Sequence, residues 1–327
     1  MHPTDPSKRS TGARLAALAG AAALAPLSLA ARAAPVPATF RIGYQKGGAT
    51  LVLAKRRGNI EARLKRLGID KVEWVEFQFG PPMLEAIGAG AVDIGSVGDT
   101  PPIFAQAGGA NLVYAAATPS TEHAILVPKN STIRSLAELR GKRVAFGKGS
   151  SAHNVTLRAL AIGGLSYGDI QPAFLAPADA SAAFVGGNID AWTIWDPFFA
   201  VAESAYQARV LIDTTREPRL ASHSFYIANR TFADKYPDTL SAVLDEIGEL
   251  VRYSAANRDE VAALAAQVTG IDVAVQRNAF RRAQLQFGPV TEQVLAEQQQ
   301  IADTFYQQKL IPKPIQVRDI WWRYSAG

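Results

Sequence analysis

The sequence predicts an α/β fold built from two similar lobes with a small-molecule site between them. Two motifs occur twice, about one hundred residues apart. Residues 41–47 (R-I-G-Y-Q-K-G) resemble residues 143–149 (R-V-A-F-G-K-G), and 90–99 (G-A-V-D-I-G-S-V-G-D) resembles 187–196 (G-N-I-D-A-W-T-I-W-D). Both motifs lie where a strand leads into a helix, and α/β sheets bind ligands at such turns. The shared order and spacing favour duplicated lobes over chance matches of ordinary strand openings.

Apolar periodicity predicts the elements of each half. The first half should contain strand 40–45, helix 50–65, strand 71–78, helix 83–89, strand 92–96, helix 101–106 and strand 112–117. The second should contain strands 124–128, 143–146, 170–175, 189–194, 210–212 and 224–228, with one helix starting within 151–154 and ending near 161 and another at 178–184. Pro81-Pro82 and Pro101-Pro102 suit first helical turns, and Ser135 with Glu138 has capping-box spacing.

After Pro237 the pattern becomes helical, with helices expected at 240–255, 258–268, 272–285 and 291–308. We expect this region to pack back on the first lobe. The first lobe should therefore be discontinuous, formed by residues 35–120 and 225–327, and the second should be 121–224. The chain should cross between the lobes near residues 117–123 and 221–226.

The N-terminus has the pattern of a cleaved signal peptide, residues 1–34. Lys8, Arg9 and Arg14 precede an apolar run from Leu15 to Ala30, and Ala31-Arg32-Ala33 offers small residues for cleavage after Ala33. A membrane anchor is the alternative, but 15–30 is shorter than the roughly 20 residues that span a bilayer. Because the chain has no cysteine to carry a lipid, we expect a periplasmic protein without a lipid anchor.

Composition argues against several function classes. Residues 1–34 hold four of the 34 basic and one of the 29 acidic side chains, which leaves a net charge of +2 for residues 35–327. Nucleic-acid binding therefore loses its main support. Cysteine is absent, and His123, His153 and His223 are far apart in sequence, so neither a thiol nucleophile nor a zinc site is expected. We expect no cofactor.

Four turns concentrate residues suited to ligand binding: 45–50, 96–102, 147–154 and 192–197. Glycines let a backbone approach a ligand, and a helix N-terminus offers free N–H groups to an anion. Each turn alone could equally be a tight strand-to-helix connection. In the fourth turn Trp192 and Trp195 could form an aromatic wall, although either could instead belong to the core.

Known catalytic and phosphate motifs are not completed. A P-loop needs G-x-x-x-x-G-K-[ST], but five residues separate Gly141 from Gly147, and Lys148 is followed by Gly149. Ser150 and Ser151 lie near His153, yet the chain has no G-x-S-x-G elbow. We therefore expect no catalytic residues.

Several phrases together resemble the aliphatic-sulfonate-binding proteins of ATP-driven importers, which are similar to taurine- and nitrate-binding relatives. They are G-Y-Q-K-G (43–47), G-P-P-M-L-E-A-I (80–87), G-D-T-P-P-I-F-A-Q-A (98–107), K-G-S-S-A-H-N (148–154), P-A-D-A (177–180) and D-A-W-T-I-W-D-P (190–197). The resemblance covers essentially all of 35–327. Val97 departs from it, because a hydroxyl residue is expected there in some relatives.

The resemblance implies a two-lobed periplasmic binding protein of type II-like fold, with two crossings and the ligand in the interlobe cleft. It implies an organosulfonate ligand, permease and ATPase subunits of an ABC importer as partners, and a monomer. Asp196 could cap a helix, meet a ligand amine or latch the lobes. The expected ligand-binding residues are Gln45, Gly48, Ala49, Ser96, Gly98, Asp99, Ser150, Ser151, His153, Asn154, Trp195 and Asp196.

Two alternatives stay open at this point. A binder of taurine or nitrate would share the fold, with Asp196 or Asp99 available to a taurine amine. An enzyme on the same fold is also conceivable, because fold alone does not define function; a signal peptide argues against a biosynthetic enzyme of the cytoplasm.

Overall fold

The computed structural model describes residues 35–324. The expected signal peptide and its cleavage site lie outside the described residues. Among the helices of residues 35–324, none is both long and apolar enough to cross a membrane.

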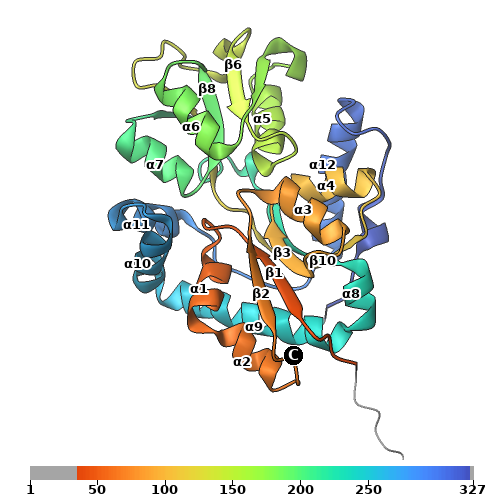
Figure 1. Ribbon diagram of the computed structural model, residues 1–327. Coiled ribbons are helices and arrows are strands. Elements are labelled where there is room, and N and C mark those ends of the chain that lie inside the picture. The colour runs from red at the N-terminus through yellow and green to blue at the C-terminus, as the bar shows by residue number, and fades with distance from the viewer. Residues whose placement is uncertain (1–34, 325–327) are drawn as a thin grey trace, which may run out of the picture. The chain divides into compact units, whose positions relative to one another are not determined.

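Ten strands in the described chain form two mixed five-stranded sheets of matching topology (Figure 1). The first sheet has the order β2-β1-β3-β10-β4 and the second has the order β7-β6-β8-β5-β9. The strands of the first sheet are β1 (Phe40–Tyr44), β2 (Val72–Glu76), β3 (Ile94–Val97), β4 (Leu112–Pro119) and β10 (His223–Asn229). Those of the second are β5 (His123–Val127), β6 (Arg143–Phe146), β7 (Gln171–Phe174), β8 (Ala191–Trp195) and β9 (Arg209–Asp213).

Both sheets use parallel and antiparallel pairing in the same places. β1 pairs in parallel with β2 and β3, just as β6 pairs in parallel with β7 and β8. β10 is antiparallel to β3 and β4, as β5 is to β8 and β9. The chain passes between the sheets after β4 and again after β9. We call each sheet with its packed helices lobe 1 and lobe 2; their exact residue boundaries stay a prediction.

The repeated Gly-x-(Val/Ile)-Asp motif has the same structural role in both lobes. The Arg41 N–H donates to the Asp93 carboxylate at 2.7 Å, and the Arg143 N–H donates to Asp190 at 2.8 Å. Each aspartate N–H in turn donates to the carbonyl of its arginine at 2.9 Å. In lobe 1 this exchange joins the start of β1 to the segment that enters β3, and in lobe 2 it joins the start of β6 to the segment that enters β8. The repeat found in the sequence is therefore a real structural duplication.

Glycine explains the main local departure from the predicted elements of lobe 1. The expected helix 50–65 is two helices, α1 (Ala49–Arg57) and α2 (Asn59–Lys65). Gly58 has a φ of 68°, and its N–H donates to the Ala54 carbonyl, so it ends α1 in the left-handed conformation that glycine adopts without strain. The remaining helices of this half are α3 (Gly80–Gly88) and α4 (Thr100–Ala107), both with proline in the first turn as expected.

Lobe 2 is covered by α5 (Ser151–Ile162), α6 (Pro177–Val185) and α7 (Phe198–Ala205). The sequence did not predict α7, whose start follows the Asp196-Pro197 pair. At Ser135 a single 3-10 turn (Leu136–Leu139) forms instead of a capped helix, and the Glu138 carboxylate accepts hydrogen bonds from the Arg134 N–H and the Ser135 hydroxyl. Two further short 3-10 turns are Tyr167–Asp169 and Pro218–Leu220.

The C-terminal helices pack against elements of lobe 1. They are α8 (Arg230–Lys235), α9 (Pro237–Ala256), α10 (Arg258–Thr269), α11 (Val273–Arg282) and α12 (Glu292–Gln307), followed by a 3-10 turn at Val317–Ile320. Apolar side chains of α9 and α10 share a core with β1 and α1, whereas α12 shares a core with α3 and α4. α11 also reaches lobe 2, where Val275 and Ala279 contact Ala200 of α7.

Replacing Asp93 with alanine should test the duplicated strand exchange. Asp93→Ala leaves the Arg41 N–H without its acceptor, and we expect a loss of about 1–3 kcal/mol in the free energy of unfolding, measured by urea denaturation. Asp190→Ala should have a similar effect. As a control, Asp70→Ala at an exposed turn should change stability by less than about 0.5 kcal/mol. An equal loss at Asp70 would contradict the assigned role.

Candidate functional site

A cavity of about 410 Å³ lies between the two lobes and is lined by turns at the ends of their strands. Lobe 1 contributes the turns after β1 and β3, the end of β4 and the start of β10, and the region after α11 adds a further wall. Lobe 2 contributes the start of α5 and the turn between β8 and α7. Nine of the predicted site residues line it: Gln45, Gly48, Ala49, Ser96, Gly98, Ser150, Ser151, Trp195 and Asp196.

Among the helices that start at this cavity, α1 and α5 have neither a side-chain cap nor a proline in the first turn. In the described chain α1 begins after Gly48, which has no side chain to cap it, and α5 begins after Ser150. The Ser150 hydroxyl could cap α5, but it donates to the Gly147 carbonyl at 2.7 Å instead. The N–H groups of a first helical turn have no partner within the helix. Both helices therefore offer free N–H groups, and the positive ends of their dipoles, to the cavity.

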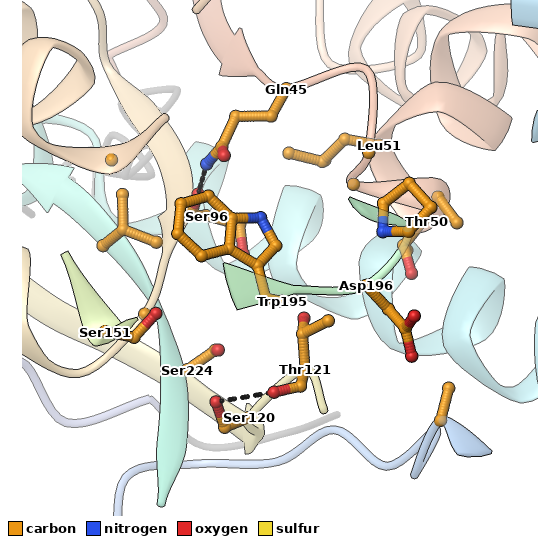
Figure 2. A pocket seen from close by; sticks show the side chains of 18 of the residues that line it. Gln45, Thr50, Leu51, Ser96, Ser120, Thr121, Ser151, Trp195, Asp196 and Ser224 are labelled. Atoms are coloured by element: carbon orange, nitrogen blue, oxygen red, sulfur yellow. Dashed lines mark hydrogen bonds between the residues drawn. The ribbon is translucent and has the colours of Figure 1, made fainter. Parts of the chain in front are cut away.

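Hydrogen bonds within the turn at 45–50 show which of its backbone N–H groups can donate to a ligand. The Gly48 N–H donates to the Gln45 carbonyl at 2.9 Å, so Gly48 shapes the turn with an N–H that is already used. The N–H groups of 49–51 remain as donors. The Gln45 side chain crosses to β3, where its amide donates to the Ser96 carbonyl at 3.1 Å (Figure 2). Tyr226 completes this wall through hydrogen bonds of its side chain with Thr50 and Ser96.

The two tryptophans of lobe 2 have different environments. The Trp195 ring lies among the cavity side chains in Figure 2, 5.9 Å from the His123 ring and 6.3 Å from the Phe198 ring. Trp192 is 1% exposed and packs in the core of lobe 2 with Phe184. The alternatives that the sequence left open are thus resolved, with Trp195 at the cavity and Trp192 in the core.

Asp196 is bound by an arginine from the other side of the cleft. The Arg282 guanidinium at the end of α11 donates to both Asp196 oxygens, at 2.9 and 3.1 Å, and to Glu203 at 2.6 Å. The same guanidinium lies 3.9 Å from the Phe199 ring centre. Burial raises the pKa of Asp196, while the hydrogen bonds from Arg282 oppose that shift. Asp196 also accepts from the Ala200 N–H at 3.1 Å, so it both caps α7 and joins α7 to α11.

Three predicted residues lie outside the cavity lining. Asp99 is fully buried and accepts hydrogen bonds from Thr100 and from the Asn154 amide, both at 2.7 Å. Because Asp99 belongs to lobe 1 and Asn154 to α5, this bond joins the lobes. His153 is also fully buried, with its ring stacked on Phe146 at 4.9 Å and near Phe305 at 5.1 Å. Ligand contact by these three residues stays a prediction, and the geometry gives each a structural role.

Gly98 and Ser151 approach each other closely from opposite lobes. A Cβ placed on Gly98 would lie 2.7 Å from the Ser151 Cβ and 2.8 Å from its Oγ, which is too close for any side chain. The lobes therefore meet here through a bare backbone on one side. The Ser151 hydroxyl also contacts a histidine that the sequence did not select, since its Oγ lies 2.8 Å from the His123 Nε2.

Sequence reasoning missed several residues that line the cavity. They are Thr50, Ser120, Thr121, His123, Phe198, Ser224, Tyr226, Gln276, Phe280 and Gln284. His123 and Thr121 follow the first chain crossing, and Ser224 and Tyr226 follow the second. The sequence predicted where the chain crosses between the lobes. Because a cleft between two lobes is lined by the segments that cross it, position next to a predicted crossing could have identified these four residues.

The cavity carries little unpaired charge. Among the described residues that line it, Lys46 is the only lysine or arginine, and its amino group is 3.3 Å from the Glu76 carboxylate. Of the other acids at the cavity, Asp196 is paired with Arg282. The remaining polar groups are amides, hydroxyls, backbone N–H groups and His123. Such a site suits a ligand held by hydrogen bonds from neutral donors.

Two α/β lobes of matching topology, two crossings and an interlobe cavity define the periplasmic binding-protein fold, which confirms the predicted fold class. A model of the NMT1-like family matches residues 33–270. An aliphatic sulfonates-binding protein of Escherichia coli is 44% identical over 310 residues, covering 94% of this chain and 95% of the relative. The chain therefore belongs to the NMT1-like family, and the resemblance to aliphatic-sulfonate-binding proteins is confirmed.

Solved structures agree with this assignment. The alkanesulfonate-binding protein SsuA of Xanthomonas axonopodis pv. citri, bound to MOPS, has a TM-score of 0.84 and 41% identity, covering 88% of this chain and 99% of the other. The periplasmic aliphatic sulphonate binding protein SsuA of Escherichia coli has a TM-score of 0.77 and 42% identity, covering 89% and 94%. The desulfurization enzyme DSZB, at 15% identity and a TM-score of 0.64, shares the fold alone.

Removing Arg282 should show how strongly the Asp196 contact stabilises the protein. Arg282→Ala leaves a buried carboxylate uncompensated and removes the contact with Phe199, so we expect about 3–5 kcal/mol of destabilisation in urea unfolding. Arg277→Ala is the matched control on the same helix, because the Arg277–Asp259 pair is solvent-exposed. That control should lose less than about 1 kcal/mol. Equal losses of stability in the two variants would show that the Asp196–Arg282 pair stabilises the protein no more than an exposed ion pair does.

Proposed function

We propose that this chain is a substrate-binding protein that captures aliphatic sulfonates between its two lobes and delivers them to an ABC importer. The relatives named as aliphatic sulfonate-binding proteins support this proposal, since they match nearly the whole chain. The observation that carries it is the pair of uncapped helices, α1 and α5, which begin at the same cavity.

A sulfonate suits this arrangement because it is a permanent monoanion with three acceptor oxygens. Free N–H groups at 49–51 and at the start of α5 can bind these oxygens without a buried cation. Each charge-assisted hydrogen bond contributes on the order of 1–3 kcal/mol. In this proposal the Gln45 amide and the Ser151 hydroxyl lie beside the head group, while Gly98 allows close approach.

The rest of the cavity suits an organic tail. Trp195, Phe198 and Phe280 contribute apolar surface to the lining. A volume of about 410 Å³ is far larger than an ion of nitrate size requires. These features favour a sulfonate with a carbon chain over nitrate.

Taurine is the alternative within the same class, and it needs a carboxylate for its amine. Asp196 is already bound by Arg282 and the Ala200 N–H. Asp99 is fully buried and bound by Thr100 and Asn154. Because neither aspartate is free for an amine, the geometry favours sulfonates with uncharged tails.

We propose that the protein has no enzymatic activity of its own. It would act in the periplasm as a monomer that meets the permease and ATPase subunits of its importer. Closure of the lobes around the ligand would present the surface that the permease recognises. The enzyme alternative rests on a neighbour that shares the fold alone, and turnover of a sulfonate by the purified protein would contradict our proposal.

Calorimetric titration of the mature protein, refolded to remove carried-over ligand, should test the ligand class. We expect one-to-one binding of pentanesulfonate, weaker binding of taurine, and no detectable binding of nitrate or sulfate. Tighter binding of taurine or nitrate than of pentanesulfonate would keep the fold assignment but contradict the proposed substrate.

Truncating Trp195 should weaken recognition of the tail. For Trp195→Ala we expect pentanesulfonate affinity to fall by about 1–3 kcal/mol, roughly 5- to 150-fold, with a smaller loss for methanesulfonate. Titration of both ligands measures the difference. Tyr306→Ala removes an exposed aromatic ring of α12 and should leave both affinities unchanged. Equal losses for the two ligands would contradict a role in binding the tail.

A further inference from the structure

His123 is a buried histidine whose two ring nitrogens both have defined partners. It begins β5 directly after the first chain crossing and is 2% exposed. Its Nδ1 lies 2.5 Å from the Thr121 carbonyl oxygen, and its Nε2 lies 2.8 Å from the Ser151 Oγ. Ser151 lines the cavity at the start of α5 (Figure 2).

These partners determine which ring nitrogen carries the proton. A carbonyl oxygen only accepts hydrogen bonds, so the His123 Nδ1 must donate to Thr121. In a neutral ring the Nε2 is then an acceptor, and the Ser151 hydroxyl must donate to it. The Ser151 oxygen consequently presents only lone pairs to the cavity. A group that only accepts is badly matched to an anionic oxygen.

Protonation of His123 reverses this direction. Both ring nitrogens of a charged histidine donate, so Nε2–H would donate to the Ser151 Oγ. The Ser151 hydroxyl hydrogen would then be free to turn toward the cavity and donate to the ligand. We propose that His123 acts as a positioning residue which takes up a proton when the anion binds and thereby converts Ser151 into a hydrogen-bond donor. This inference rests on the proposed binding of a sulfonate at this cavity.

The charges around His123 allow such a transition. Burial lowers its pKa in the structure described, whereas the Asp99 carboxylate and the Thr121 carbonyl act in the opposite direction. Trp195 of β8 faces the ring without adding a charge. The neighbouring Glu122 is engaged with Thr214, and Lys46 is paired with Glu76. A bound anion would add a negative charge beside Ser151, which raises the pKa of the histidine.

Linkage gives the sign of the effect on affinity. The ligand binds more tightly to the protonated protein, so its affinity is highest at low pH and falls as pH rises above the pKa of free His123. Between the pKa of the free and the bound protein, the Kd should increase about tenfold per pH unit. Alkanesulfonates stay ionised over this range, so the ligand itself contributes no titration.

Calorimetric titration with pentanesulfonate between pH 5 and 9 tests the proposal. Each pH should be measured in two buffers of different ionisation enthalpy, and both must lack sulfonate groups. We expect a net uptake of up to one proton per bound ligand, together with a Kd that increases with pH. In the ligand-free protein at neutral pH, ¹⁵N chemical shifts should show the His123 Nδ1–H tautomer.

Three variants separate the proton switch from a general structural effect. Ser151→Ala removes the hydroxyl that links histidine to ligand, so binding should be weaker and independent of His123 protonation. His123→Gln offers Ser151 an amide donor that does not titrate, so binding should persist without proton uptake. His223→Gln alters a histidine that pairs with Glu297 outside the cavity, and proton uptake should stay as in the unmodified protein.

The outcomes distinguish this inference from the proposed function. Pentanesulfonate binding without proton uptake, or an Nε2–H tautomer in the ligand-free protein, would overturn the switch and leave the proposed function intact. Absence of pentanesulfonate binding at every pH would overturn both. If His123→Gln does not fold, Ser151→Ala and the tautomer measurement still decide the result.

Discussion

The exchange of hydrogen bonds between an aspartate and strand β1 in one sheet, and between an aspartate and strand β6 in the other, is the constraint on which the site depends. Asp93 and Asp190 hold β3 and β8 in register with β1 and β6 at the ends remote from the cavity. Because these pairs are parallel, aligned starts also align the ends, and the turns that follow open at the same edge. The interlobe cavity is therefore built from two copies of one strand arrangement.

The second aspartate of each repeat joins the lobes in a different way. Asp99 follows β3 and receives the Asn154 amide from α5, while Asp196 follows β8 and receives Arg282 from α11. Equivalent positions thus make one contact across the cleft from each side. Their partners differ, since one is a neutral amide in a fully buried place and the other is a guanidinium near the cavity. The duplication has been kept in the backbone and has diverged in the side chains.

Much of the fold follows from local patterns, because strands and helices here are marked by apolar periodicity, proline and glycine. The predicted strand 143–146 has the same bounds in the structure, and the helical C-terminal region was also predicted correctly. The failures are local: Gly58 divides a helix, and α7 follows a turn whose start resembles a loop. Those depend on backbone conformation, which short-range patterns describe poorly.

The site was less predictable than the fold. Gln45, Ser96 and Trp195 follow predicted strands and line the cavity. His123 could be recognised as a site residue only from the three-dimensional structure, in which the chain crossing places it beside Ser151. The role of Asp196 was open because its partner Arg282 lies 86 residues away. Contacts between distant segments cannot be derived from spacing along the chain.

The contact between Gly98 and Ser151 also limits how closely the two lobes can approach each other. One surface is backbone and the other includes the Cβ of Ser151, which is fixed to the main chain of α5 and cannot rotate away from a side chain at position 98. Steric contact between Gly98 and Ser151 at the interlobe cavity therefore limits how closely the start of α4 can approach the start of α5. In a chain with any larger residue at position 98, each lobe would keep its fold, but the added side chain would hold the two lobes apart.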